Sequence, residues 1–223
     1  MNYHINTGLI IEQFRANDGC PLCNIQRIVQ ENICKELLAD GCMDDAVRNE
    51  VNAKGFCEKH FDMLFSMPSK LSLALQLITR TKSVLKGYSK PATFTAAKKL
   101  SAYVVKTKQT CIVCDYTERE MVKYYKAIPA LYDNENEFKT LFSSGVKICE
   151  NHFARLLNYS NKAGKSKKIF LSALYNGMLS ALEHDVDLLN AFATRHDYRN
   201  IGKPLGEAEN ALQNIRCDLY GKK

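Results

Sequence analysis

The sequence predicts an all-α protein built from two copies of one helical unit together with long packing helices. Apolar residues recur at helical spacing along most of the 223-residue chain, as they do in helices that bury one face. The motif order CxxC followed by CxxHF occurs twice. No stretch shows a convincing alternation of apolar and polar residues, the pattern of a half-buried strand.

The four motifs recur at matching distances. In the first copy, CPLC spans residues 20–23 and CEKHF begins at Cys57. In the second copy, CIVC spans residues 111–114 and CENHF begins at Cys149. The copies are therefore offset by 91 residues at the first cysteine and by 92 residues at the third. Agreement at every motif indicates an internal duplication.

The residues between the motifs have helical character in both copies. Residues 21–39 carry an apolar stripe, and residues 113–127 repeat it in a helix that we expect to end near Pro129. Shorter second helices are expected to end at Gly55 and Gly145, because glycine is common just past a helix end. A third helix then begins at each CxxH motif.

Longer helices are predicted to pack around the two copies. Their ranges are 69–87, 91–108, 167–195 and 206–221. The range 167–195 carries one apolar stripe, formed by Phe170, Leu174, Met178, Leu182, Val186 and Leu189. We expect a division into residues 1–88 and 89–223, with the two halves forming one pseudo-symmetric body.

Each copy supplies three cysteines and one histidine, which is a ligand set of structural zinc sites. The first set is Cys20, Cys23, Cys57 and His60, and the second is Cys111, Cys114, Cys149 and His152. Residues three apart share a helix face, and helix N-termini favour the thiolate that binds metal. Four protein ligands complete a tetrahedron, so the sequence predicts two structural zinc ions per chain. Phe61 and Phe153, which follow the histidines, are expected to enter the core.

Other interpretations of the cysteines are weaker. CPLC is similar to a thioredoxin-like redox dithiol, but that motif belongs near a βαβ pattern, which is missing here. Eight buried small residues would not need matched spacing. Iron–sulfur clusters usually take four thiolates. Iron or cobalt in place of zinc stays open.

Composition places further bounds on the chain. No run of 18 uncharged apolar residues is present, so no membrane span is expected. The N-terminus lacks a basic stretch followed by an apolar one, so no signal peptide is expected. Nine cysteines in a chain without an export signal favour a reducing cytoplasm over a disulfide framework. Cys34 is predicted to be buried and Cys42 to be exposed in a turn.

The net charge of +7 comes from one segment. Residues 63–114 contain no Asp or Glu but nine basic residues, which are Lys70, Arg80, Lys82, Lys86, Lys90, Lys98, Lys99, Lys106 and Lys108. Residues 70–108 could therefore bind nucleic acid or another polyanion. The basic residues scatter around the helix that begins at Lys70, and this helix is too apolar to present an exposed binding surface for nucleic acid. We therefore favour lysines that are simply solvated over lysines that contact phosphates.

The paired motifs resemble those of an uncharacterised bacterial family, a domain of unknown function with CPxC and FCxxHF motifs and a C-terminal DYR segment. Here that segment is Asp197, Tyr198 and Arg199, followed by Glu207 and Glu209. The second copy departs mildly, because CIVC lacks the proline. The resemblance spans nearly the whole chain and implies no reaction.

Three functions stay open from the sequence. The first, which we favour, is a zinc-stabilised binding or scaffold protein with a protein partner or an anionic ligand. The second is an enzyme whose site lies between the halves and uses Asp197, Tyr198, Arg199 and Glu209. The alternative for this segment, which we favour, is a structural ion pair of Asp197 and Arg199 that locks the last helix. The third is a polyanion binder that uses the basic segment. Asp185 and His196 are about 16 Å apart along one helix, so they cannot share a metal ion.

Overall fold

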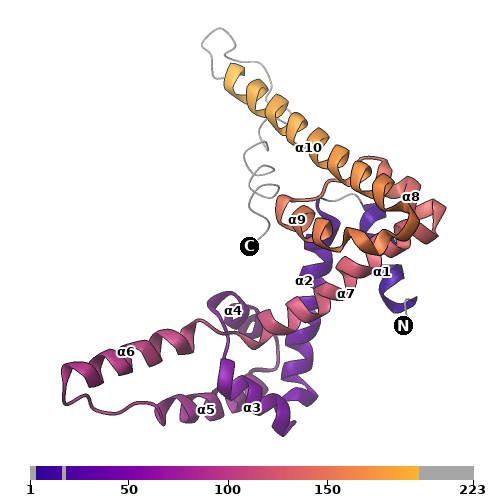
Figure 1. The fold of residues 1–223 in the computed structure, drawn as a ribbon. Helices are drawn as coiled ribbons and strands as arrows, with labels where there is room; N and C mark the ends of the chain where they lie inside the picture. Colours follow the sequence, from indigo (N-terminus) through magenta and orange to yellow (C-terminus); the bar gives the residue numbers. More distant parts are fainter. Residues whose placement is uncertain (1–3, 17–18, 196–223) are drawn as a thin grey trace. The chain divides into compact units, whose positions relative to one another are not determined.

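The computed structural model describes residues 4–16 and 19–195, and this part of the chain contains helices and no strand (Figure 1). The all-α prediction is therefore confirmed. The final helix predicted over 206–221 lies outside the described residues.

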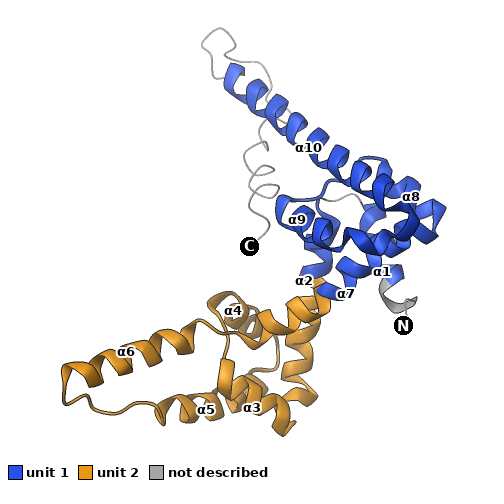
Figure 2. Cartoon of the chain, viewed as in Figure 1, with its two compact units in different colours: residues 1–26, 122–223 blue, residues 27–121 orange. Residues whose placement is uncertain are grey.

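The chain divides into two compact units (Figure 2). Unit 1 contains residues 1–26 and 122–223, and unit 2 contains residues 27–121. Two helices, α2 (Pro21–Leu38) and α7 (Ile112–Asn134), contribute residues to both units. The sequence division between residues 88 and 89 stays a prediction about the repeat.

Unit 1 is held together by an aromatic core. Besides its parts of α2 and α7, its elements are α1 (His4–Ala16), α8 (Asn136–Ser143), α9 (Glu150–Tyr159), the short 3₁₀ segment η2 (Ser160–Ser166) and α10 (Lys167–Arg195). The Phe14 ring contacts Phe138 and Phe142, with centroid distances of 5.1 and 5.8 Å. Tyr132 contacts Phe142 and Phe170 edge-on. These contacts join α1, α7, α8 and α10.

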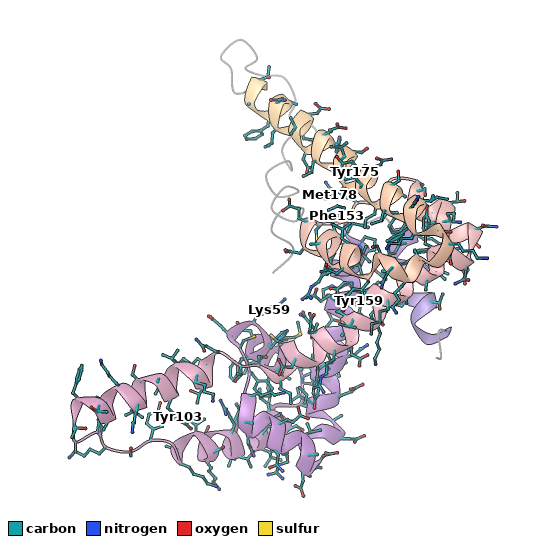
Figure 3. All side chains as sticks on the ribbon, viewed as in Figure 1. Lys59, Tyr103, Phe153, Tyr159, Tyr175 and Met178 are labelled. Carbon is teal, nitrogen blue, oxygen red and sulfur yellow. The ribbon has the colours of Figure 1, made fainter. Side chains whose placement is uncertain are left out.

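Unit 2 packs shorter helices against α2 and α7. Its own elements are η1 (Asp40–Cys42), α3 (Asp45–Lys54), α4 (Glu58–Ser66), α5 (Lys70–Leu85) and α6 (Phe94–Lys108). Helix α3 packs on α5. Helices α5 and α6 run alongside each other as a hairpin (Figure 1). Tyr103 of α6 donates a hydrogen bond of 3.0 Å from its hydroxyl to the carbonyl oxygen of Val84 (Figure 3).

The ends of α3 show how the sequence sets a boundary. Asp44 caps its N-terminus, since the carboxylate accepts hydrogen bonds from the backbone N–H groups of Ala46 and Val47. Such a cap satisfies donors that have no partner within the helix. The helix ends at Gly55, whose φ of 68° lies in the left-handed region that favours glycine. This end was predicted.

Several local expectations were wrong. Helix α7 continues through Pro129 to Asn134, because Ile128, Leu131 and Tyr132 are buried and their packing outweighs the lost hydrogen bond. Cys42 is buried, at 7% exposure. The helix α1 had not been anticipated.

The apolar stripe of α10 is only partly buried. Phe170, Leu174 and Met178 belong to the core, whereas Val186 is 55% exposed. None of the described helices is both long enough and apolar enough to cross a membrane.

Candidate metal centres

The structure brings the eight predicted ligands together in two clusters, but it pairs motifs from different copies. Site A contains Cys20, Cys23, Cys149 and His152, and site B contains Cys57, His60, Cys111 and Cys114. In each cluster the four ligand atoms lie within 4.8 Å of one another. Among the described residues, these two clusters are the groups of Cys, His, Asp or Glu side chains placed to hold a metal ion. The grouping within each copy that the sequence suggested is therefore corrected.

The correction has a physical reason. Helical spacing shows that Cys20 and Cys23 share a face, and it shows the same for Cys149 and His152. Helical spacing does not show which CxxC pair lies beside which CxxH pair, because that depends on tertiary packing. The crossed arrangement places all of site A in unit 1 and all of site B in unit 2.

All four motifs present their ligands in the same way. Cys57 and Cys149 are the N-caps of α4 and α9, and each carbonyl oxygen accepts a bond of 2.8 Å from the backbone N–H four residues later. Cys20 and Cys111 immediately precede α2 and α7. Each cluster therefore lies where two helix N-termini converge, and the positive ends of the helix dipoles favour thiolates there.

The distances in site A fit a tetrahedral ion. His152 Nδ1 lies 3.5, 3.4 and 3.1 Å from the sulfurs of Cys20, Cys23 and Cys149. The sulfurs of Cys23 and Cys149 are 3.6 Å apart. A tetrahedral zinc ion with Zn–S of ~2.3 Å and Zn–N of ~2.05 Å separates two sulfurs by about 3.8 Å and a sulfur from a nitrogen by about 3.6 Å. The distances in the cluster are within about half an ångström of that geometry.

Site B has the same geometry. His60 Nδ1 lies 3.2, 3.4 and 3.3 Å from the sulfurs of Cys57, Cys111 and Cys114. The sulfurs of Cys57 and Cys114 are 3.9 Å apart. Both histidines therefore offer the same ring nitrogen, Nδ1, to their cysteines.

The two sites differ in what surrounds the histidine. His152 Nε2 lies 3.0 Å from Gln26 Oε1, and the Tyr125 ring packs against the imidazole. His60 Nε2 is buried without a hydrogen-bond partner in the structure. The outer partner of a ligating histidine fixes its tautomer and orientation. Only site A has such a partner.

Exposure also distinguishes the sites. Three of the four residues of site A are buried and Cys23 is half-buried, whereas Cys114 of site B is exposed and Cys57 is half-buried. Solvent therefore reaches site B more readily.

Without metal, the environment affects proton affinity at both sites. Burial is the main cause that raises the pKa of the Cys20 thiol, with the neighbouring Cys149 and Cys23 thiols adding to it. Burial also raises the pKa of Cys114 to about 12, aided by Cys111. For His152, burial opposes protonation, but the hydrogen bonds that the protonated ring donates to the sulfurs of Cys149 and Cys23 raise the pKa to about 9. A metal ion must displace the protons that these groups hold near neutral pH.

Backbone contacts position the two motifs of site B. The backbone N–H of Ile112 donates to the carbonyl oxygen of Gly55 at 3.0 Å, and the hydroxyl of Thr110 donates to the carbonyl oxygen of Lys54 at 2.7 Å. These bonds join the residues that flank Cys111 to the end of α3, just before Cys57. The spacing of the two motifs in site B is thus set directly by the polypeptide.

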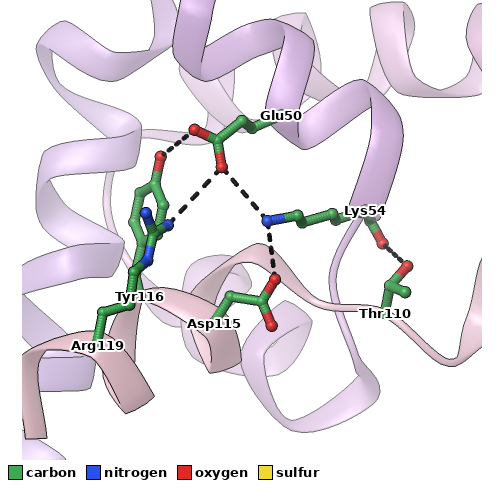
Figure 4. A network of polar contacts seen from close by, with 6 residues as sticks. All are labelled: Glu50, Lys54, Thr110, Asp115, Tyr116 and Arg119. Carbon is green, nitrogen blue, oxygen red and sulfur yellow. Dashed lines mark hydrogen bonds and ion pairs between the residues drawn. The ribbon is translucent and has the colours of Figure 1, made fainter. Parts of the chain in front are cut away.

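Polar side chains reinforce this junction (Figure 4). Glu50 accepts a hydrogen bond from the Tyr116 hydroxyl at 3.1 Å and pairs with Lys54 and Arg119 at 3.5 and 3.8 Å. Lys54 also pairs with Asp115 at 2.8 Å, which raises the pKa of the lysine. The paired side chains are partly exposed to solvent, so each pair is worth about 0–1 kcal/mol. They strengthen a contact that the backbone bonds already define.

The segment before Cys149 is anchored to α10. Lys147 Nζ lies 3.1 Å from Asp185 Oδ1, and the Asp185 side chain is 5% exposed. Asp185 is thus the buried ion-pair partner of Lys147, which lies two residues before Cys149 of site A. Its expected separation from His196 cannot be compared, because His196 lies outside the described residues.

The remaining candidates have different outcomes. Cys34 is fully buried, as predicted. Phe61 is 36% exposed, contrary to expectation, and stacks on Phe65, while Phe153 is half-buried (Figure 3). The candidate enzyme residues Asp197, Tyr198, Arg199 and Glu209 lie outside the described part of the chain.

Sequence reasoning missed Gln26, although its position three residues after Cys23 was a usable signal. Residues three apart on a helix share a face, so a polar side chain there points toward the cluster.

Comparisons with known proteins place the chain without assigning it a reaction. It is similar to an "Uncharacterized 23.9 kDa protein in xynA 3'region" of Caldicellulosiruptor sp. (strain Rt8B.4), with 22% identity over 192 residues, covering 86% of this chain and 89% of that protein. No solved structure matches. The model of DUF6062, described as a family of unknown function, matches residues 1–221. The chain therefore belongs to the DUF6062 family.

Proposed function

We propose that this protein is a cytoplasmic binding or scaffold protein whose two units are each stabilised by one zinc ion. The observation that carries the proposal is the convergence of three thiols and one imidazole nitrogen in each cluster, at distances that suit a tetrahedral ion. Soft thiolates with one imidazole favour zinc over calcium or magnesium, which prefer oxygen ligands.

The ligand sets support a structural role for the metal. Catalytic zinc ions usually have three protein ligands and keep a fourth position open for water or substrate. Here sites A and B each offer four protein ligands. An ion bound by all four would have no position left for a reacting molecule, so its contribution is to hold the helices together.

Crossed pairing makes each ion a long-range cross-link. Site A joins residues such as Cys23 and Cys149, which are 126 positions apart, and site B joins Cys57 and Cys114, which are 57 apart. The entropy cost of bringing chain ends together grows with loop length. A metal ion at site A would therefore close a loop that contains all of unit 2.

A reducing compartment is consistent with this role. All eight cysteines within the described residues are free thiols, and thiolates rather than disulfides bind zinc. No observation in the described part of the chain favours the enzyme alternative over the structural one.

Metal analysis tests the proposal. Protein purified without added metal should contain two zinc ions per chain, and removal by a chelator should unfold helices reversibly, as seen by circular dichroism. A metal content near zero, or iron with visible absorbance, would overturn the zinc assignment. Intact thermal stability after complete metal removal would overturn the structural role.

A further inference from the structure

Helix α5 leaves a stripe of large aliphatic side chains exposed. Leu71, Leu75, Ile78 and Leu85 are 74%, 38%, 48% and 60% exposed. Their positions fall within about 80° of one another around a helix with 100° per residue. The opposite face of α5 is packed within unit 2, since Leu73 and Gln76 are buried. This helix is therefore apolar on its exposed face as well as on its buried face.

The stripe has the spacing of a helix-packing seam. Leu71, Ile78 and Leu85 are seven residues apart, with Leu75 and Lys82 at the intervening positions. This is the a/d pattern of a heptad repeat over about two heptads, or roughly 21 Å along the axis. Small or hydroxyl side chains border it, namely Ser72, Ala74, Thr79 and Thr81. Small borders let the backbone of a second helix approach closely.

The charge around the stripe selects the kind of helix that fits. Lys82 lies within the seam, and Lys86 follows Leu85. Neither α5 nor α6 contains an acidic residue, because none occurs over residues 63–114. A helix seated on the stripe therefore meets apolar contacts in the middle and positive charge at the Lys82 end.

We propose that the outer face of α5 docks an amphipathic helix of a partner protein, with apolar a/d residues and acidic residues along its borders. Amphipathic helices bind such surfaces through apolar side chains at this spacing. Carboxylates of the partner helix would pair with Lys82 and Lys86 and so fix its position along α5. This inference gives the partner class for the proposed binding role and rests on that role, but it does not depend on the metal's identity.

Other occupants fit less well. If a second copy of the chain docked through its own α5, two basic hairpins without acidic residues would meet. Like charges would then be in contact. Nucleic acid offers phosphates to the lysines but nothing equivalent to the aliphatic stripe. A helix that lies on an anionic membrane carries Lys and Arg along its polar face, whereas the borders of this stripe are Ser72, Ala74, Thr79 and Thr81. Arg80 donates a hydrogen bond to the carbonyl oxygen of Thr107 on α6, and the Val84 carbonyl oxygen accepts one from Tyr103 of the same helix. The apolar stripe therefore lies on the side of α5 away from its hairpin partner.

Peptide binding to the full-length, metal-loaded protein tests the proposal. The probe is a fluorescent three-heptad helix with leucine at a and d and glutamate at e and g. A second peptide has lysine at e and g, and a third has serine at a and d. We expect the acidic leucine peptide to bind at least tenfold more tightly than either control, by fluorescence anisotropy.

Variants of the protein locate the binding face. The double variant Leu75→Ser/Ile78→Ser should abolish binding, whereas Tyr175→Ser/Leu179→Ser should leave it unchanged, because those exposed residues (58% and 41%) lie on α10 (Figure 3). Lys82→Glu should weaken binding of the acidic peptide and strengthen binding of the lysine peptide. Circular dichroism and zinc content confirm that each variant is folded.

Several outcomes overturn the inference. In the first, the acidic peptide fails to bind, or its binding survives Leu75→Ser/Ile78→Ser. Alternatively, the protein self-associates or cosediments with phosphatidylglycerol vesicles, and the same double variant abolishes that behaviour. If the protein contains two zinc ions but does not bind the peptide, only this inference is contradicted. A protein without zinc that binds the peptide through α5 contradicts only the proposed metal role.

Discussion

Gln26 Oε1 lies 3.0 Å from His152 Nε2, while Nδ1 of the same ring faces the three thiols of site A. With Nδ1 directed at the metal position, Nε2 carries the hydrogen and donates it to the Gln26 carbonyl. This contact fixes the ring tautomer that a metal ion requires. The equivalent nitrogen of His60 is buried without a partner in the structure.

Gln26→Ala should therefore weaken metal binding at site A by about 10- to 100-fold, the usual effect of losing an outer-shell partner, and leave site B unchanged. Competition with a chromophoric chelator measures both sites. Arg27→Ala is the matched control, because Arg27 is the next residue of α2 and pairs with Glu31 on the exposed surface. Equal affinity of site A in both variants would contradict the role of Gln26.

Gly55 is predicted to support site B. It has a φ of 68°, and a Cβ there would lie 2.9 Å from Arg80 Nε. Its carbonyl oxygen also accepts the hydrogen bond from Ile112. Gly55→Ala should cost about 1–3 kcal/mol from backbone strain alone, with a further loss from the clash and weaker metal binding at site B.

Gly145→Ala provides the control, because Gly145 has a φ of 95° with nothing within 4 Å of the added Cβ. It should show the strain without the clash. Denaturant unfolding and chelator competition compare the two variants, and equal losses would show that the Arg80 contact is unimportant.

Cys57→Ser should destabilise unit 2 more than Cys34→Ser does. The first change removes a proposed ligand thiolate, and metal binding can contribute folding free energy of order 10 kcal/mol in small zinc modules. The second places a hydroxyl at a fully buried position, which costs about 1–3 kcal/mol. Melting temperatures and zinc content test this, with one zinc ion lost only from Cys57→Ser. Equal melting temperatures would contradict the ligand assignment.

Metal binding should release protons. At pH 7.5 the metal-free protein holds protons on Cys20 and Cys111, whose pKa values burial raises, on Cys114 with a pKa of about 12 and on His152 with a pKa of about 9. Because each pKa lies above the solution pH, zinc must displace these protons, and affinity should fall as the pH is lowered. Calorimetry in two buffers of different ionisation enthalpy should detect the release; identical heats in both would contradict it.

The sequence predicted the helices well, and it singled out the eight Cys and His residues that the structure gathers into two clusters, because both depend on local spacing. Gly55 ended α3 as expected, and the CxxC and CxxH pairs lie at helix starts as expected. It could not predict the pairing of motifs, because site A joins residues more than 100 positions apart through packing that no short pattern records. Tertiary packing also decides two features that local spacing did not predict. These are the continuation of α7 past Pro129 and the exposure of Leu71 on α5.

The crossed pairing is the central claim, and zinc content of two double variants tests it most directly. Cys20→Ser/Cys149→Ser removes two ligands from site A alone, so it should retain one zinc ion per chain. Cys20→Ser/Cys57→Ser removes one ligand from each site, so it should lose both ions. Pairing within each sequence copy predicts the reverse, so one zinc ion retained by Cys20→Ser/Cys57→Ser and none by Cys20→Ser/Cys149→Ser would contradict the account.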